Sequence, residues 1–323
     1  MAIEIKWGFI GCGDVTEVKS GPAFNKIKGS EVVAVMRRDS QKAQDYALRH
    51  GIAKWYDNAT HLINDEEVNA IYIATPPSTH AKYAIEAMRA GKPVYVEKPM
   101  ATTYDECLEM NRISKETGVP LFVAYYRRTL PGFLKVKELV EEGRIGKPLL
   151  ANIRLMRPAQ EIEKENATWR VDPATAGGGV FYDLASHQID FMTFVFGEVV
   201  EVNGATANMA RFYKAEDTVV ANFKFASGVL GAGVWSFVTG IESSEDTMEI
   251  IGTEGKILFS GFGHSPIVLI TSKGTVSFPF LNPENIQYEL IKEVVEAIQD
   301  KKLSISTGET AAHTNWVMEQ IVK

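Results

Sequence analysis

Residues 5–16 read IKWGFIGCGDVT and decide the fold of the first half of the chain. A mostly apolar, strand-like run over 5–11 passes directly into the glycine pair Gly11 and Gly13. Glycines at this point let the chain turn tightly and let backbone N–H groups approach a pyrophosphate at the start of a helix. The third position of the strict G-x-G-x-x-G pattern is Thr16, so the string alone fits either a dinucleotide-binding loop or a simple strand–helix turn.

Strands and helices alternate from this loop to about residue 125. Further strands are expected over 31–36, 70–75, 93–97 and 120–125, and helices over 40–50, 79–90 and 103–117. Gly91-Lys92-Pro93 and Gly118-Val119-Pro120 each combine a helix-stopping glycine with a proline that opens the next strand. Alternation at this spacing predicts βαβ units and a mostly parallel sheet.

The pattern changes after residue 125, where extended segments dominate. Strands are expected over 149–156, 199–207, 218–225, 229–237, 247–252, 256–259, 267–271 and 275–278, and helices over 134–142, 180–196, 286–299 and 309–322. Turn pairs such as Ser227-Gly228 and Lys273-Gly274 indicate hairpins. This half therefore predicts a large, mostly antiparallel sheet with helices.

Two domains follow from these patterns. Residues 1–124 are expected to form an α/β, doubly wound Rossmann domain that binds NAD(P). Residues 125–323 are expected to form an α+β domain for substrate binding and oligomerisation. The sequence leaves open whether the last helix packs on the first domain.

Composition excludes several classes of protein. The chain has 323 residues, of which 45% are hydrophobic and 23% charged, with a net charge of −7, so a globular protein is expected and a generic nucleic-acid binder is not. Two cysteines cannot build a disulfide framework and fit a reducing cytosol. No apolar run reaches about 18 residues and the N-terminus lacks a basic start, so neither a membrane span nor a signal peptide is expected. A cytoplasmic protein is the resulting expectation.

The end of the second strand bears on the choice of cofactor. An NAD site usually places an acidic residue there for the ribose hydroxyls. Here residues 33–39 read VAVMRRD, so Met36 or Arg37 takes that position and Arg38 follows. Guanidinium groups suit the additional 2′-phosphate of NADP. Asp39 lies further along and keeps NAD as the alternative, and a solvated loop is the other interpretation of the two arginines.

Lys98 follows the strand that ends VYVEKP. Ligands of an open α/β sheet bind beyond the carboxyl ends of its strands. A lysine there can hold a substrate oxygen and lower the pKa of an acid–base group beside it. The alternative is an ordinary surface lysine before a proline turn.

A second candidate site lies in residues 176–190, AGGGVFYDLASHQID. Three glycines precede an expected helix on which Asp183 and His187 are four residues apart and therefore share one face. A carboxylate and an imidazole so placed suit proton transfer during alcohol oxidation. A structural Asp–His pair is the alternative. No metal is expected, because no further ligands lie within helical range.

These strings together resemble one known family. GFIGCGDV, ATPPSTH over 74–80, the EKP string, Trp169-Arg170 and the pattern GGGxxxDxxxHxxD are similar to the glucose–fructose oxidoreductase, inositol dehydrogenase and rhizopine-catabolism family (Gfo/Idh/MocA). They occur in the expected order from residue 8 to residue 190.

The resemblance implies a role for each matching residue. Lys98 would lie near the nicotinamide and the substrate hydroxyl, His187 would be the acid–base, and Asp183 would bind and orient the substrate. The expected cofactor-binding set is Gly11, Cys12, Gly13, Asp14, Val15, Arg37, Arg38, Thr75, Pro76, Pro77, His80, Glu97 and Lys98. The expected substrate-binding set is Tyr125, Arg127, Trp169, Arg170, Asp183 and His187.

The expected function is hydride transfer between NADP, in preference to NAD, and a hydroxyl or carbonyl of a sugar, cyclitol or vicinal diol. Two alternatives are a non-enzymatic nucleotide-sensing member of the same fold and a member that cleaves glycosides with a retained cofactor. The presence of Lys98, Asp183 and His187 together favours an enzyme. A homodimer or homotetramer is expected, because the apolar strand 229–237 needs more cover than the few helices provide.

Overall fold

The computed structural model describes residues 4–323. Its contacts divide the chain into two compact units. Unit 1 comprises the chain up to Tyr126 together with Pro283–Ala312, and unit 2 comprises Arg127–Asn282 together with His313–Lys323. These units are defined by contacts alone, and the functional boundary expected after residue 124 stays a prediction.

The sheet of unit 1 has six strands, all parallel, in the order β3-β2-β1-β4-β5-β6. The strands are β1 (Ile5–Ile10), β2 (Ser30–Met36), β3 (Lys54–Tyr56), β4 (Ala70–Ile73), β5 (Val94–Val96) and β6 (Leu121–Val123). This order confirms the expected doubly wound sheet. It places the ends of β1 and β4 side by side at the point where the strand order reverses, where such sheets bind ligands. The short edge strand β3 carried no clear signal in the sequence.

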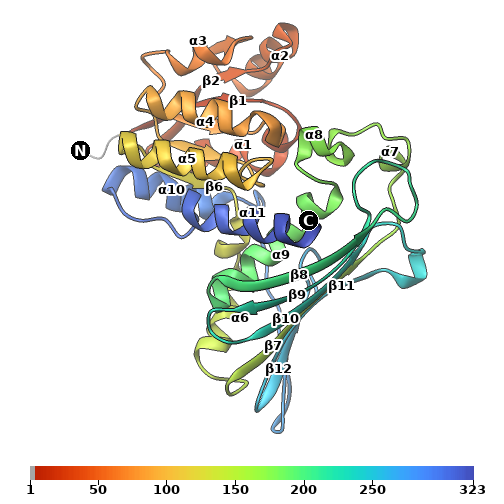
Figure 1. Cartoon of the computed structure of the whole chain (residues 1–323). Helices are drawn as coiled ribbons and strands as arrows, with labels where there is room; N and C mark the ends of the chain where they lie inside the picture. The colour runs from red at the N-terminus through yellow and green to blue at the C-terminus, as the bar shows by residue number, and fades with distance from the viewer. Residues whose placement is uncertain (1–3) are drawn as a thin grey trace. The chain divides into compact units, whose positions relative to one another are not determined.

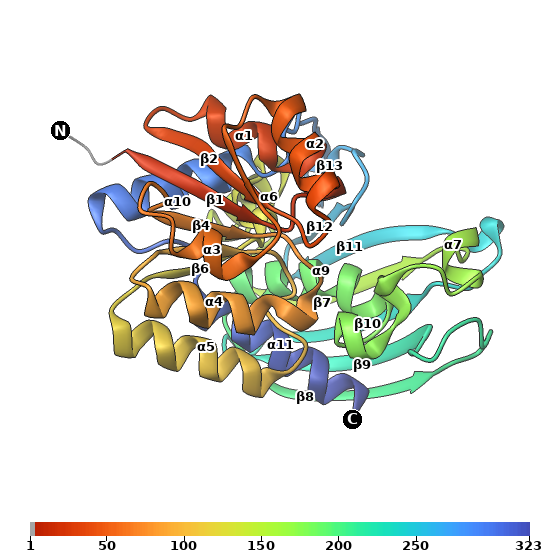
Figure 2. The same ribbon diagram turned by 90° about the horizontal axis from the view of Figure 1, so that it is seen from above.

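Helices cover both faces of this sheet, as Figure 2 shows from above. They are α1 (Gly21–Lys26), α2 (Ser40–His50), α3 (Ala59–Ile63), α4 (His80–Arg89), α5 (Tyr104–Thr117) and α10 (Tyr288–Asp300). One buried cluster joins the strands to α3, α4 and α5, and a second joins them to α1, α2 and α10. Both faces are therefore buried, which explains the nearly continuous apolar strands.

A segment from the far end of the chain completes unit 1. The Ser306 hydroxyl donates to the Val123 carbonyl at 2.6 Å, and the Val123 N–H donates to the Ser306 carbonyl at 3.1 Å. Leu290 and Val294 of α10 are fully buried in the second cluster. Unit 1 is thus built from two stretches that are far apart in the sequence.

The sheet of unit 2 has eight strands in the order β14-β13-β12-β11-β7-β10-β9-β8. The strands are β7 (Pro148–Met156), β8 (Val199–Ala207), β9 (Thr218–Phe225), β10 (Leu230–Ser236), β11 (Glu245–Gly252), β12 (Gly255–Phe259), β13 (Ile267–Thr271) and β14 (Gly274–Phe278). Every neighbouring pair is antiparallel except β7 with β10. The expected mostly antiparallel sheet is confirmed, as are the two hairpins β9–β10 and β13–β14.

The helices of unit 2 are α6 (Pro131–Glu141), the short α7 (Glu161–Lys164) and α8 (Pro173–Ala176), the long α9 (Val180–Phe196), and the part of α11 (Gly308–Val322) from His313 onward. Helices α6 and α9 pack on one face of the sheet, and Figure 1 shows none of these helices over its other face. On the covered side, Phe181 of α9 packs edge-on against Trp235 of β10 at 5.2 Å between ring centroids. Among residues 4–323, no helix is long and apolar enough to cross a membrane.

Candidate active site

The glycine loop follows β1 at the carboxyl edge of the first sheet. Gly11 has φ +95°, and a Cβ there would lie 2.8 Å from the Thr75 backbone nitrogen, so only glycine fits this position. A Cβ on Gly13 would meet no atom within 4 Å. Within residues 4–323 the N–H groups of Gly13 and Asp14 have no backbone acceptor. The loop therefore presents donors and open space, which fits a pyrophosphate.

Thr16 takes the place of the third glycine without blocking this loop. Its buried hydroxyl donates to the Gly13 carbonyl at 2.7 Å, and the Tyr46 hydroxyl donates to the Thr16 carbonyl at 2.9 Å. A π-helical turn, Val15–Lys19, follows. A Cβ on Gly21 would lie 2.0 Å from the Thr16 carbonyl oxygen. The close backbone approach that a glycine permits therefore occurs at Gly21 and not at position 16. The departure from the strict motif thus leaves the space around Gly13 open.

The two arginines lie where the sequence predicted, at the end of β2. Arg37 is half-buried and donates through Nη1 to the Cys12 carbonyl at 3.3 Å, while Arg38 is exposed. Asp39 caps α2 by accepting from the Lys42 N–H at 3.1 Å, and this hydrogen bond lowers the pKa of its carboxyl. Asp39 is therefore engaged in a cap, and Arg37 contacts the glycine loop through the Cys12 carbonyl.

His80 ties together two loops at this edge. Its fully buried ring places Nε2 2.7 Å from the Thr75 carbonyl oxygen and Nδ1 3.1 Å from the Pro99 carbonyl oxygen. Burial lowers the pKa of the imidazole, while the two carbonyls oppose that shift. The loop of Pro76 and Pro77 and the loop after Lys98 are held in one arrangement as a result. His80 thus links the loop after β4 to the loop after β5.

Glu97 is buried in a network of hydrogen bonds. Its Oε1 accepts from the Tyr72 hydroxyl at 2.7 Å and from Gln287 Nε2 at 2.6 Å. The Ser20 hydroxyl oxygen lies 2.9 Å from the Tyr72 hydroxyl oxygen, and the Tyr95 hydroxyl donates to Gln287 Oε1 at 2.8 Å. Burial raises the pKa of Tyr72 and Tyr95 well above the ordinary value. Glu97 therefore supports the chain next to Lys98, and its expected contact with a cofactor stays a prediction.

Helix α9 of unit 2 carries the second group of candidate residues. The Asp183 carboxylate lies 3.5 Å from Arg170 Nε and is one-quarter exposed. The Arg170 guanidinium in turn lies over the Trp169 ring, 4.7 Å from its centroid. The structure thus brings together three residues that the sequence predicted to bind substrate. A carboxylate beside a guanidinium can bind adjacent hydroxyls of a polyol through complementary acceptors and donors.

His187 lies one turn further along α9 and is nearly buried, with 3% of its surface exposed. Its ring meets Phe262 edge-on at 6.2 Å between centroids. The Arg127 guanidinium stacks on the same Phe262 ring, with its central carbon 4.4 Å from the ring centroid. Arg127 also donates through Nε to the Gly261 carbonyl at 2.9 Å. Arg127 is buried, so it holds the turn that carries Phe262 beside His187.

A buried ion pair holds α9 in place. Arg128 donates to both carboxylate oxygens of Asp190, at 2.9 and 2.7 Å, and both residues are buried. The Thr314 hydroxyl of α11 adds a contact with Asp190 at 3.3 Å. Burial raises the pKa of the Asp190 carboxyl, and the Arg128 charge opposes that rise. The last acidic residue of the GGGxxxDxxxHxxD string is therefore a structural anchor.

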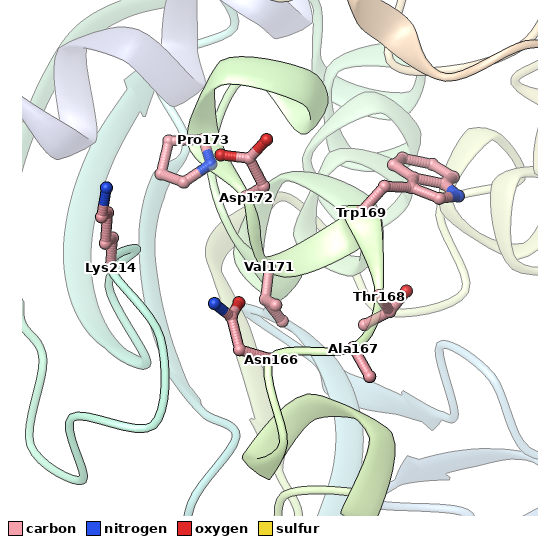
Figure 3. A pocket seen from close by; sticks show the side chains of 8 residues that line it. All are labelled: Asn166, Ala167, Thr168, Trp169, Val171, Asp172, Pro173 and Lys214. Atoms are coloured by element: carbon pink, nitrogen blue, oxygen red, sulfur yellow. The ribbon is translucent and has the colours of Figure 1, made fainter.

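The loop that carries Trp169 also borders a cavity of about 360 Å³. The cavity is lined by Asn166, Ala167, Thr168, Trp169, Val171, Asp172, Pro173 and Lys214. In Figure 3 the Lys214 side chain, from a separate segment, lies on the opposite side of the view from Trp169. Asp172 is occupied as the N-cap of α8, where it accepts from the Ala174 N–H and the Thr175 hydroxyl.

Several supporting residues gave no distinct signal in the sequence. Tyr125 was expected to line a pocket, and the structure places it fully buried in the core of unit 1. Gln287 and Ser20 stand outside every motif, yet both belong to the network around Glu97. Asp246 is likewise unmarked, although its carboxylate accepts from three successive N–H groups of the turn that carries Phe262. Asp190 differs from Gln287, Ser20 and Asp246, since it closes the string that contains Asp183 and His187.

Comparison with known proteins assigns the family. A model described as the oxidoreductase family with an NAD-binding Rossmann fold matches residues 5–125, and a model of the GFO/IDH/MocA C-terminal domain matches residues 133–258. The chain belongs to the GFO/IDH/MocA family. The resemblance inferred from the motifs is thereby confirmed, and with it a nicotinamide-binding Rossmann fold and a dehydrogenase or reductase activity on CH–OH groups.

Individual relatives of this GFO/IDH/MocA protein match over most of its length. Oxidoreductase P35 of Formosa agariphila is 38% identical over 322 residues, which cover 99% of this chain and 98% of that protein. The scyllo-inositol 2-dehydrogenase (NAD(+)) of Bacillus subtilis is 26% identical and covers 85% of this chain and 79% of its own. Levoglucosan dehydrogenase in complex with NADH and levoglucosan shares the fold, with a TM-score of 0.89 at 22% identity over 98% of this chain and 96% of that one.

The Arg128–Asp190 pair gives a test of how α9 is anchored. Arg128→Met should destabilise unit 2 by about 3–5 kcal/mol, because it leaves a buried carboxylate without its partner. The double variant Arg128→Met with Asp190→Leu should recover most of that loss, since neither charge remains. Chemical denaturation measures both, with Arg154→Met as the control for the exposed pair with Glu245. Equal, small effects of Arg128→Met and Arg154→Met would contradict the anchoring role.

Proposed function

We propose that this enzyme transfers a hydride between a nicotinamide cofactor and a hydroxyl-bearing carbon of a sugar, cyclitol or vicinal diol. The observation that carries the proposal is the placement of Asp183 and His187 on successive turns of α9, with Arg170 beside Asp183. The names of relatives such as scyllo-inositol 2-dehydrogenase support a polyol substrate. We further propose that unit 1 performs the cofactor-binding role expected of residues 1–124, and unit 2 the substrate-binding role expected of 125–323.

The proposed chemistry divides the reaction among the side chains. When bound, the nicotinamide accepts the hydride that leaves the carbinol carbon. His187 takes the hydroxyl proton in the same step, which converts the C–O bond to a carbonyl, and returns it in the reverse direction. Asp183 accepts from a substrate hydroxyl while Arg170 donates to a neighbouring oxygen. Lys98 holds the reacting oxygen, and its charge favours the deprotonated imidazole.

The proton step gives the first test of this function. His187→Asn should lower kcat by about 100- to 10,000-fold, because a positioned acid–base contributes about that factor. Lys98→Ala should also lower turnover and move the acidic limb of the pH–rate profile upward, since the charge that favours the neutral imidazole is lost. Asp183→Ala should mainly raise KM. Steady-state absorbance at the nicotinamide band, over a panel of sugars, keto-sugars, inositols and diols, measures all three.

Controls on the same preparations separate chemistry from folding. A thermal melt and a cofactor titration should give wild-type values for His187→Asn. A folded, cofactor-binding variant with nearly wild-type kcat would remove His187 from the mechanism. If wild-type protein with glycoside substrates releases the aglycone with no net change in nicotinamide absorbance, the glycoside-cleaving alternative is favoured instead.

We propose that NADP is preferred to NAD. Arg37 contacts the glycine loop, Arg38 follows it with an exposed side chain, and Asp39 is engaged in capping α2. Replacing Arg38 or Arg37 by Ala should weaken NADP binding by about 1.5–3 kcal/mol, the contribution of a charge-assisted hydrogen bond, and leave NAD binding nearly unchanged. Calorimetric titration with both cofactors measures this difference, and Lys42→Ala in α2 serves as a charge-matched control. Tighter NAD binding that neither substitution alters would exclude the preference.

We propose that the enzyme is a cytoplasmic homodimer or homotetramer. The uncovered face of the second sheet exposes Val220, Leu230 and Leu150, and the last two are cross-strand neighbours. Water-exposed apolar side chains on one sheet face favour pairing of two such sheets across a two-fold axis. Cys12 and Cys107 are free thiols, which suits the reducing cytosol. Sedimentation at micromolar concentration should give an oligomer that Leu230→Asp dissociates, and a monomeric wild type would contradict the proposal.

A further inference from the structure

Unit 2 contains a second cavity, of about 460 Å³, at the ends of β7 and β11. Four of its lining side chains are apolar: Leu155 and Met156 from the end of β7, Leu184 from α9, and Phe262 from the turn that Asp246 caps. Leu184 directly follows Asp183, and Phe262 meets the His187 ring edge-on at 6.2 Å. The cavity is therefore lined by a ring that contacts His187 and by the residue that follows Asp183 on α9.

The charged side chains that line the cavity are already bound within the protein. Arg157 donates to both oxygens of Glu163, at 2.9 and 2.5 Å, and to the Pro158 carbonyl at 2.8 Å. Glu245 accepts from Arg154 Nε at 2.9 Å. Arg157 and Glu245 thus each have an ion-pair partner already, so they are poorer partners for an incoming hydroxyl.

Asp246 is engaged even more fully. It accepts from the N–H groups of Gly261, Phe262 and Gly263 at 2.8–2.9 Å and from the Ser260 hydroxyl. Ser244 is the remaining polar lining residue. A polyhydroxylated group placed here would lose water from several hydroxyls and regain few hydrogen bonds, which is unfavourable. An apolar group would lose only water contacts, which is favourable.

We propose that this cavity holds an apolar part of the substrate, either a hydrocarbon ring edge or an alkyl substituent, while Asp183 and Arg170 bind the hydroxyls. The inference rests on the proposed function and narrows it from polyols in general to diols and sugar derivatives that have an apolar side. A fully hydroxylated cyclitol lacks the group that the cavity fits.

A homologous series tests the cavity with turnover and binding measured separately. The compounds are propane-, butane-, pentane- and hexane-1,2-diol, which keep the same carbinol pair and add one methylene at a time. Burial of each methylene should increase affinity about three- to fourfold, or roughly 30-fold or more over the series. Calorimetry or saturation-transfer NMR on the full-length protein gives affinities, and nicotinamide absorbance gives kcat/KM with either cofactor. Myo-inositol is the hydroxylated comparison.

Variants assign the effect to this cavity. Leu184→Asn and Met156→Gln should flatten the dependence of affinity on chain length, because each makes one wall polar. Leu134→Asn is the matched control, since Leu134 is an exposed leucine of α6 that does not line the cavity. Thermal melts establish that each variant is folded. The ratio of hexanediol to propanediol affinity is the readout, so a general loss of activity in a variant does not affect it.

Each outcome bears on one of the two proposals. A chain-length dependence that Leu184→Asn removes and Leu134→Asn retains supports the apolar cavity. No dependence in the wild type, or one that persists unchanged in both cavity variants, overturns it. Turnover of hydroxylated substrates without any chain-length preference overturns the cavity proposal and leaves the proposed function standing. Binding of the longer diols without turnover of any carbinol supports the cavity and contradicts the proposed function.

Discussion

The buried carboxylate of Glu97 is the constraint on which the arrangement of unit 1 depends. A carboxylate removed from water must find donors, because an unpaired buried charge costs several kcal/mol. Tyr72 of β4 and Gln287, just before α10, supply them. Three segments are thereby held at one point, and Glu97 and Gln287 are 190 residues apart in the sequence. The position of the following residue, Lys98, and of the carbonyl that His80 contacts follows from this arrangement.

Unit 2 uses the same principle with an ion pair. Helix α9 is apolar on most of its surface, so burial alone leaves its rotation poorly specified. Asp190 bound to Arg128 sets that rotation. Asp183, His187 and Asp190 are spaced four and three residues apart, which puts them on one face. The buried anchor at one end of that face therefore fixes the direction of the two candidate side chains, Asp183 and His187.

In both candidate regions, side-chain hydrogen bonds hold a loop in one conformation. In unit 1 the glycine loop is held by Thr16 and Tyr46, and the Gly13 and Asp14 N–H groups have no backbone acceptor among residues 4–323. In unit 2 the turn carrying Phe262 is held by Asp246 and Arg127, and its aromatic ring packs against His187. Because these loops are already ordered in the free protein, binding a ligand costs less conformational entropy.

The sequence by itself determined the two sheet types, the family, and the positions of the glycine loop, Lys98 and the Asp183–His187 face. These features are local, because glycine spacing, strand–helix alternation and helical periodicity each depend on residues that are close together in the sequence. Only the tertiary structure decided that residues 283–312 complete the first unit, that Glu97 and Asp190 are buried anchors, that Tyr125 is core, and that Asp246 shapes the turn beside His187. Burial and long-range partners depend on which distant segments meet, and a side chain's type does not reveal its distant partner.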